Sequence, residues 1–297
     1  MEIIDCQVHV WDTGARDRLP EDFPRQDLLR LFDDQVTYEV QLAAMDTVGV
    51  SATVLNVPGV IYRRRRPDGF LEYDNSYADE AAARYPDRFY SVAWADAAAP
   101  DIEDVLDVLQ ASPGVVGIRQ HVGPHDGLAE LTDGSWDRFL AGAGRRGLTV
   151  FIVMTGALDA LHAAVRRHPE TRFVIDHFGL PVPQVRPAES GGPFDQLPSV
   201  LALAQHPNVA IKWSGAQRLS KEPYPYLDIW PHLLKVVEAF GVDRLMFASD
   251  WTVSRSLCSY AEAVFYLRDT SHLSETEKRE ILSGTARRWL HLTQLEH

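Results

Sequence analysis

The sequence predicts a single-domain α/β fold, a (β/α)8 TIM barrel spanning residues 1–297. Three observations carry this prediction. Strand-like and helix-like segments alternate from end to end, no repeat or linker interrupts them, and polar residues recur at the strand ends. The length suits one barrel, because barrels of about 250 residues form one domain. A doubly wound open sheet is the alternative, but no glycine-rich phosphate-binding loop follows any strand.

Eight strands are expected from short apolar runs, and helices from apolar residues at helical spacing. The strands are expected at 3–9, 52–57, 88–94, 115–121, 148–154, 172–177, 208–214 and 244–250. The helices include 38–48, 71–85, 102–110 and 136–145, with further apolar stripes near 158–165 and 233–240. Ser274 and Glu277 form a capping box, which predicts the start of the last helix.

The first strand, within I-D-C-Q-V-H-V-W-D, alternates apolar and polar residues. The even set is Ile4, Cys6, Val8 and Val10, and the odd set includes Asp5, Gln7 and His9. Side chains of a strand alternate between its faces, so we expect the even set to pack on helices and the odd set to line the barrel interior. A buried polar row must be paired, bound to a metal or used in chemistry.

Polar residues end five of the eight strands, which would bring them together at one mouth of the barrel. They are Gln7 and His9, Arg119 and His121, Asp176 and His177, Lys212 and Ser214, and Asp250. Structural alternatives remain: Arg119 could pair with Asp5 or Asp250, and Lys212 could tie the barrel floor to a carboxylate. Two insertions, 58–69 and 179–194, are expected at the same mouth, where they would set substrate specificity.

The amino-acid composition indicates which kinds of molecule the protein can bind. The formal net charge of −13 argues against nucleic acid, whose phosphates would be repelled, yet a locally basic site could bind a small anionic substrate. The two cysteines give no disulfide framework, which fits a reducing cytosol. No secretory signal is visible, and no apolar run approaches the roughly 20 residues that span a bilayer. We expect a cytoplasmic protein that acts on a small molecule, with homo-oligomerisation left open.

A run of four arginines, Arg63 to Arg66, lies in the first insertion. Such runs are usually solvated or contact a neighbouring subunit. The position on a loop at the barrel mouth keeps binding of a substrate carboxylate as the alternative.

Several longer motifs carry a family resemblance. I-D-C-Q-V-H-V-W-D, G-V-V-G-I-R-Q-H, F-V-I-D-H-F-G-L-P, V-A-I-K-W-S-G and R-L-M-F-A-S-D-W-T-V follow one another over nearly the whole chain. Together they resemble the amidohydrolase-related (amidohydrolase-2) family, specifically its lactonase-like branch. That branch includes fuconolactonase, rhamnonolactonase and pyrone-dicarboxylate lactonase. The resemblance implies a barrel hydrolase.

The resemblance also implies roles for individual residues. His9, His177 and Asp250 match positions that can ligate a divalent metal, and Asp250 matches the aspartate that takes a proton from the attacking water. Arg119 matches a substrate-binding position. The family opens with H-x-H, whose first histidine is Gln7 in this chain. Glutamine is a poor zinc ligand, so we expect one weakly bound divalent metal, zinc or manganese, or none.

Opening a lactone needs a base for water, stabilisation of the carbonyl oxygen and a proton for the leaving alkoxide. Asp250 is the expected base, and His177 and His9 are expected to polarise the carbonyl. Arg119 and Lys212 would grip a substrate carboxylate, and Gln7 would hydrogen-bond the substrate or the water. The expected substrate contacts are Gln7, Arg119, His121, Lys212 and Trp251. Two other functions stay open: a metal-dependent decarboxylase, and a non-catalytic barrel that binds a small ligand.

Overall fold

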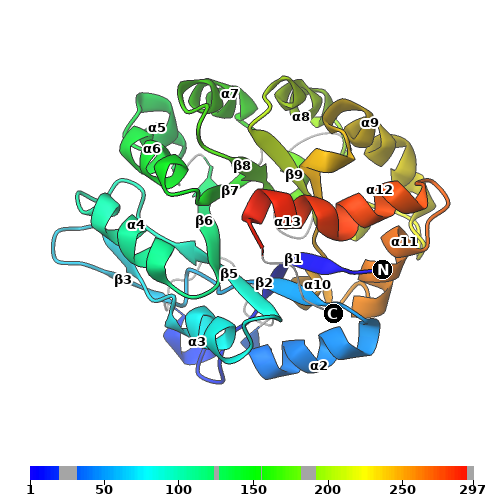
Figure 1. The fold of residues 1–297 in the computed structure, drawn as a ribbon, viewed down its shortest axis with the longest axis horizontal. Coiled ribbons are helices and arrows are strands. Elements are labelled where there is room, and N and C mark those ends of the chain that lie inside the picture. The colour runs from blue at the N-terminus through cyan, green and yellow to red at the C-terminus, as the bar shows by residue number, and fades with distance from the viewer. Residues whose placement is uncertain (20–31, 124–126, 155, 182–191, 293–297) are drawn as a thin grey trace.

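Eight parallel strands form one sheet that curves into a nearly closed barrel with helices around it (Figure 1). The computed structural model describes residues 1–19, 32–123, 127–154, 156–181 and 192–292. The strands, in their order around the barrel, are β1 (Ile4–His9), β2 (Ala52–Asn56), β5 (Phe89–Trp94), β6 (Val115–Val122), β7 (Thr149–Met154), β8 (Phe173–Ile175), β9 (Val209–Trp213) and β10 (Leu245–Phe247). The predicted fold class is confirmed.

Helices follow the strands and form the outer layer. They are α2 (Tyr38–Val48), α3 (Ser76–Arg84), α4 (Ile102–Ala111), α5 (Leu128–Asp133), α6 (Asp137–Arg145), α7 (Leu158–Arg167), α8 (Leu197–Ala202), α9 (Trp230–Phe240), α10 (Trp251–Ser254), α11 (Tyr260–Arg268), α12 (Glu275–Arg279) and α13 (Thr285–Leu290). The capping box of Ser274 and Glu277 starts α12, as the sequence predicts. None of the helices in the described part of the chain is long and apolar enough to cross a membrane.

The helix expected at 71–85 begins later than predicted. Its first residues form β4 (Leu71–Tyr73), which pairs antiparallel with β3 (Arg63–Arg65) in a hairpin. The sequence P-D-G between the two strands favours a tight turn. Asp74 then accepts a hydrogen bond from the Ser76 backbone N–H at 3.0 Å, which favours a turn ahead of α3.

The predicted face assignment of the first strand is wrong for Ile4, Asp5 and Cys6, whereas Gln7 and His9 face the interior and Val8 and Val10 the helices, as expected. The pairing of β1 with β2 shifts register between Asp5 and Val8, so the strand contains a bulge. Of the even set, Ile4 and Cys6 lie in the apolar cluster inside the barrel, and Val8 and Val10 lie in the outer cluster under the helices. Asp5 faces outward, where the Tyr260 hydroxyl of α11 donates to its carboxylate at 2.9 Å. A bulge adds one residue and reverses the parity of a strand.

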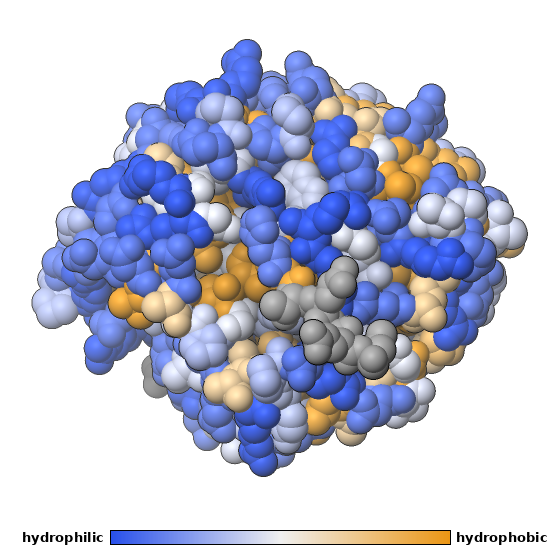
Figure 2. Space-filling model, viewed as in Figure 1, coloured by the Kyte–Doolittle hydropathy of each residue, from blue (hydrophilic) through white to orange (hydrophobic). Residues whose placement is uncertain are grey.

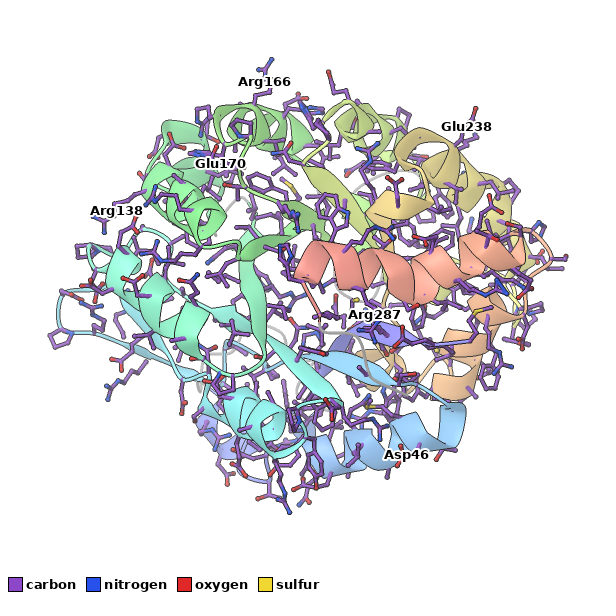
Figure 3. The ribbon with its side chains drawn as sticks, in the orientation of Figure 1. Asp46, Arg138, Arg166, Glu170, Glu238 and Arg287 are labelled. Carbon is purple, nitrogen blue, oxygen red and sulfur yellow. The ribbon has the colours of Figure 1, made fainter. Side chains whose placement is uncertain are left out.

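The N-terminal end of the barrel is filled and covered. Small and apolar side chains such as Ala52, Val54 and Met246 pack inside it, and Leu290 of α13 packs against them. Figure 1 looks onto this end, with α13 crossing in front of the strands, and Figure 2 shows the same face as mostly hydrophilic. In Figure 3, Arg287 lies beside β1, and its Nε donates to the Glu2 carboxylate at 2.8 Å. Chemistry is therefore expected at the opposite end.

Candidate active site

The polar strand ends meet at the carboxyl end of the barrel, as the sequence predicts. Seven side chains form a connected cluster there: Gln7, His9, Arg119, Asp176, His177, Lys212 and Asp250. Arg218, which the sequence analysis did not select, joins them. All eight are largely or fully buried. Buried charges at a strand mouth have to be paired, and the pairs define what the site can do.

Asp250 lies at the centre of this cluster. It follows β10 with a left-handed backbone, φ 51°, and only 1% of its surface is exposed. A non-glycine residue in this region is strained, and the surroundings must hold it there. Arg218 Nη2 donates to Asp250 Oδ2 at 2.8 Å, and Gln7 Nε2 donates to Oδ1 at 3.2 Å. The Asp250 backbone N–H also donates to the Gln7 carbonyl at 3.0 Å.

The charge of Asp250 is set by two opposing effects. Burial alone would raise the pKa of this carboxyl group. The positive charge of Arg218, followed by the nearby His177 and His9, lowers the pKa below its ordinary value overall. The carboxylate is therefore ionised at neutral pH and able to accept a proton.

Two histidines flank that carboxylate. His177 Nε2 lies 4.0 Å from Asp250 Oδ2, and His9 Nε2 lies 3.5 Å from Oδ1. Burial lowers the pKa of His177 to about 4 and that of His9 to about 3, although Asp250 opposes both shifts. Both imidazoles are therefore neutral at pH values near 7. Like Asp250, His177 has a left-handed backbone, φ 53°.

Gln7 fixes the hydrogen-bond directions in the cluster. Lys212 Nζ, whose ammonium can only donate, lies 3.2 Å from Gln7 Oε1. The amide nitrogen of Gln7 therefore faces Asp250 Oδ1 at 3.2 Å and His177 Nε2 at 3.5 Å. We assign Nε2 of His177 as the unprotonated nitrogen, since the amide can only donate to it. Its Nδ1 then donates to Ser214 Oγ at 2.9 Å.

Lys212 and Arg119 form the floor of the site through Asp176. Lys212 is 0% exposed, and its Nζ lies 2.7 Å from Asp176 Oδ1. Arg119 Nε donates to Asp176 Oδ2 at 2.9 Å. Burial would raise the pKa of Asp176, but Lys212 and Arg119 hold it well below its usual range. The arginine is in an ion pair, as one alternative proposed, but the predicted partners, Asp5 and Asp250, are wrong.

The burial and pairing of Lys212 favour a structural role over the expected substrate contact. With no exposed surface and two partners, it fits the alternative in which Lys212 ties the barrel floor to a carboxylate. Its ammonium also lies 4.4 Å from the centre of the Phe151 ring. Burial lowers its pKa, against the opposing charge of Asp176.

His121 and Trp251 are the remaining predicted substrate contacts. His121 is exposed at the end of β6, with its ring edge-on to Trp94 at 5.1 Å between centroids. The Trp251 indole N–H donates to Gln41 of α2 at 2.9 Å, and the ring stacks on Tyr260 at 4.9 Å. These contacts hold Trp251 against α2 and α11, and none of them is to the Asp250 cluster.

Arg218 is the main charged residue that sequence reasoning missed. It lies in a short 3-10 turn, Ala216–Arg218, directly after β9, and its Nε donates to Ser254 Oγ at 2.7 Å. The available signal was its position, five residues after the strand end, in a loop at the catalytic face. It was overlooked because no motif marks it.

The residues present do not fit the divalent metal that the family resemblance implies. Among the described residues, no group of three or more His, Cys, Asp or Glu side chains is arranged to hold a metal ion. The amide hydrogens of Gln7 are directed at His177 Nε2 and Asp250 Oδ1, two of the three expected ligands. Rotating the amide would set its nitrogen against the ammonium of Lys212. The Gln7 amide thus takes the place where a cation would meet these ligands.

Three arginines of the run, Arg63 to Arg65, are exposed, and Arg66 is partly buried. Arg64 pairs with Glu72 across the β3–β4 hairpin, and Arg66 pairs with Asp68 and Asp101. These pairs favour the solvated interpretation. Most of the second predicted specificity loop, 182–191, lies outside the described residues.

The buried titratable groups predict how stability depends on pH. The unfolded chain protonates His9 and His177 near their ordinary pKa of 6.5, whereas the native protein keeps them neutral to about pH 4. Asp5 acts oppositely, because burial raises its pKa from 3.8 to about 6, so the native state binds that proton first. Between about pH 6 and pH 4 the unfolded chain therefore holds about one proton more than the native protein.

The free energy of unfolding is expected to fall by about 1.4 kcal/mol for each pH unit of acidification in this window. Urea unfolding followed by circular dichroism at several pH values measures this slope. A free energy of unfolding that stays constant or rises on acidification would show that the two histidines are not held neutral.

Comparison with known proteins places this chain in a family. The amidohydrolase family model matches residues 4–292. An L-fucono-1,5-lactonase from Burkholderia ambifaria is 30% identical over 265 residues, which cover 85% of this chain and 81% of that protein. A 4-sulfomuconolactone hydrolase from Hydrogenophaga intermedia is 27% identical over 180 residues, which cover 60% of this chain and 56% of that protein.

A solved structure shows the same fold. An amidohydrolase from Burkholderia multivorans, crystallised with bound zinc, matches with a TM-score of 0.79 and 22% identity over 99% of this chain and 100% of that chain. The family match covers nearly the whole chain, including every residue of the Asp250 cluster. The chain belongs to the amidohydrolase family.

Proposed function

We propose that this protein opens the ring of a small lactone by hydrolysis, with Asp250 as the base. The single observation that carries the proposal is an ionised, buried carboxylate held by Arg218 and Gln7 beside two neutral histidines. Similarity to an L-fucono-1,5-lactonase and to a 4-sulfomuconolactone hydrolase supports a lactone as the substrate.

The proposed reaction uses groups already in place. Asp250 takes a proton from water as the water oxygen attacks the lactone carbonyl carbon. The unprotonated Nε2 of His177 accepts from the Gln7 amide and so helps to hold Gln7 against Asp250. His9, which is neutral and keeps one ring N–H, donates to the carbonyl oxygen as negative charge develops there. The bond between the carbonyl carbon and the ring oxygen then breaks, and the proton on Asp250 passes to the leaving alkoxide.

We further propose that this reaction does not depend on a metal. The amide of Gln7 donates to the same two atoms that a cation would need, and Lys212 keeps the amide in that orientation. Decarboxylation by a metal-dependent relative is the competing function. It is less well supported because its carbanion-like state relies on a bound metal.

The test is a panel of lactones given to the purified full-length protein. The panel contains L-fucono-1,5-lactone, 4-sulfomuconolactone and δ-valerolactone, and a pH indicator follows release of the hydroxy acid. Protein carrying Asp250→Asn, purified in the same way, controls for contaminating lactonases. Hydrolysis of at least one lactone by the wild type alone supports the proposal. No hydrolysis, with carbon dioxide released from aromatic acids, would replace it with decarboxylation.

A further inference from the structure

Asn56, the last residue of β2, has a side chain without any hydrogen-bond partner. Both the Nδ2 and the Oδ1 atoms are buried and unpaired, and the residue is 0% exposed. Its backbone is satisfied, since the Asn56 carbonyl accepts from the Val10 N–H at 3.2 Å. Nearly all buried polar groups in native proteins are paired, so an amide with two orphaned atoms needs an explanation.

The side chain of Asn56 points into the barrel at the level of the site. Two residues earlier, Val54 belongs to the apolar cluster inside the barrel, whereas Leu55 belongs to the outer one. Alternation then turns Asn56 inward. Its register partner on β1 is His9, which contacts Asp250 at 3.5 Å. The orphaned amide thus adjoins the proposed catalytic cluster.

The chemistry of the amide limits what can pair with it. Asn56 offers a donor and an acceptor, and both lack a partner. A hydroxyl group can accept from one and donate to the other, whereas a carboxylate or sulfonate can only accept. A hydroxyl is therefore the substrate group that satisfies the whole side chain.

We propose that Asn56 binds a hydroxyl group of the substrate, which is therefore a lactone that carries a hydroxyl. This proposal rests on the lactonase function proposed above. The amide is covered in the substrate-free protein, so the side chains at the mouth move when the substrate binds. The unpaired amide lowers the stability of the free protein in exchange for binding.

The test is Asn56→Leu, which keeps the side-chain shape and removes both polar atoms. Its kcat/KM for L-fucono-1,5-lactone is expected to fall by about 10- to 100-fold, because that substrate loses a partner for its hydroxyl. Its kcat/KM for δ-valerolactone, the same six-membered ring without hydroxyls, is expected to stay unchanged. The melting temperature without substrate is expected to rise by about 2–4 °C, because the buried orphan is gone.

Thr53→Val is the matched control on the same strand. Thr53 is buried on the opposite face of β2, where its hydroxyl accepts from Gln41 Nε2 at 3.4 Å. This variant is expected to melt at a lower temperature than the wild type and to keep the wild-type ratio of kcat/KM between the two lactones. Thr53→Val removes a polar group that has a hydrogen-bond partner, whereas Asn56→Leu removes one that has none, so the two variants distinguish these effects.

Three results would overturn the assignment. Equal losses on both lactones, or no loss on either, would show that Asn56 does not contact a substrate hydroxyl. A lower melting temperature for Asn56→Leu would show that the amide is paired in the free protein. In each case the lactonase function would still be supported if the wild type hydrolyses a lactone. If the wild type hydrolyses no lactone, both the lactonase function and the role of Asn56 are wrong.

Discussion

Asp250→Asn is expected to lower kcat/KM for lactone hydrolysis by about 10²- to 10⁴-fold, the usual contribution of a general base. Asparagine has the same shape, and its side-chain oxygen can still accept from Arg218, which now donates to Asp250 Oδ2 at 2.8 Å. It cannot take a proton from water. Initial rates over a range of substrate concentrations, with circular dichroism of the same samples, separate lost chemistry from lost fold.

Asp96→Asn is the matched control for this experiment. Asp96 also follows a strand at the carboxyl end of the barrel, but its oxygens accept from the backbone N–H groups of Leu71 and Ala98. We expect this variant to lose some stability and to keep kcat/KM within about threefold of the wild type, since it touches no group of the cluster. If Asp250→Asn retained as much activity as Asp96→Asn, Asp250 would not be the base.

Lys212→Met is expected to lower the free energy of unfolding by about 3–5 kcal/mol, as when one partner of a buried ion pair is removed. Methionine fills most of the same volume but carries no charge. Asp176 would keep only Arg119 as a cationic partner, and Gln7 Oε1 would lose its donor. Urea unfolding at neutral pH measures the loss.

Lys278→Met tests the same substitution where the ion pair is exposed. Lys278 is also buried, but its partner Glu275 is 61% exposed, so solvent screens the pair. The expected loss is below about 1 kcal/mol. Equal losses for the two variants would mean that the floor of the site is not a tightly coupled charge cluster.

The barrel fold could be predicted because its strands and helices have the expected periodicities of apolar residues in the sequence. The alternation of strand-like and helix-like segments along the chain predicted the barrel. The observed bounds of α2, Tyr38–Val48, agree with the predicted helix at 38–48. The errors fall where local geometry overrides periodicity. The bulge in β1 reversed the parity of the strand, and a turn at P-D-G made a hairpin from part of an expected helix.

The buried polar cluster was predictable where particular residue types recur at strand ends. His9, His177 and Asp250 come together as the motifs predicted. Arg218 and Asn56 were not selected, because an arginine in a loop and an asparagine in a strand have many ordinary roles. Only the ion pair between Arg218 and Asp250, and the lack of a hydrogen-bond partner for the Asn56 amide, distinguish them. Side-chain pairing of this kind has no signature in a single sequence.

The proposal of metal-independent hydrolysis centres on Gln7. The most direct measurement combines zinc and manganese analysis of the purified protein with lactone hydrolysis before and after dialysis against a chelator. We predict less than about one metal ion per ten chains, since the Gln7 amide opposes the usual three-ligand site, and an unchanged kcat/KM. Stoichiometric metal, with activity lost to the chelator and restored by zinc, would contradict the account.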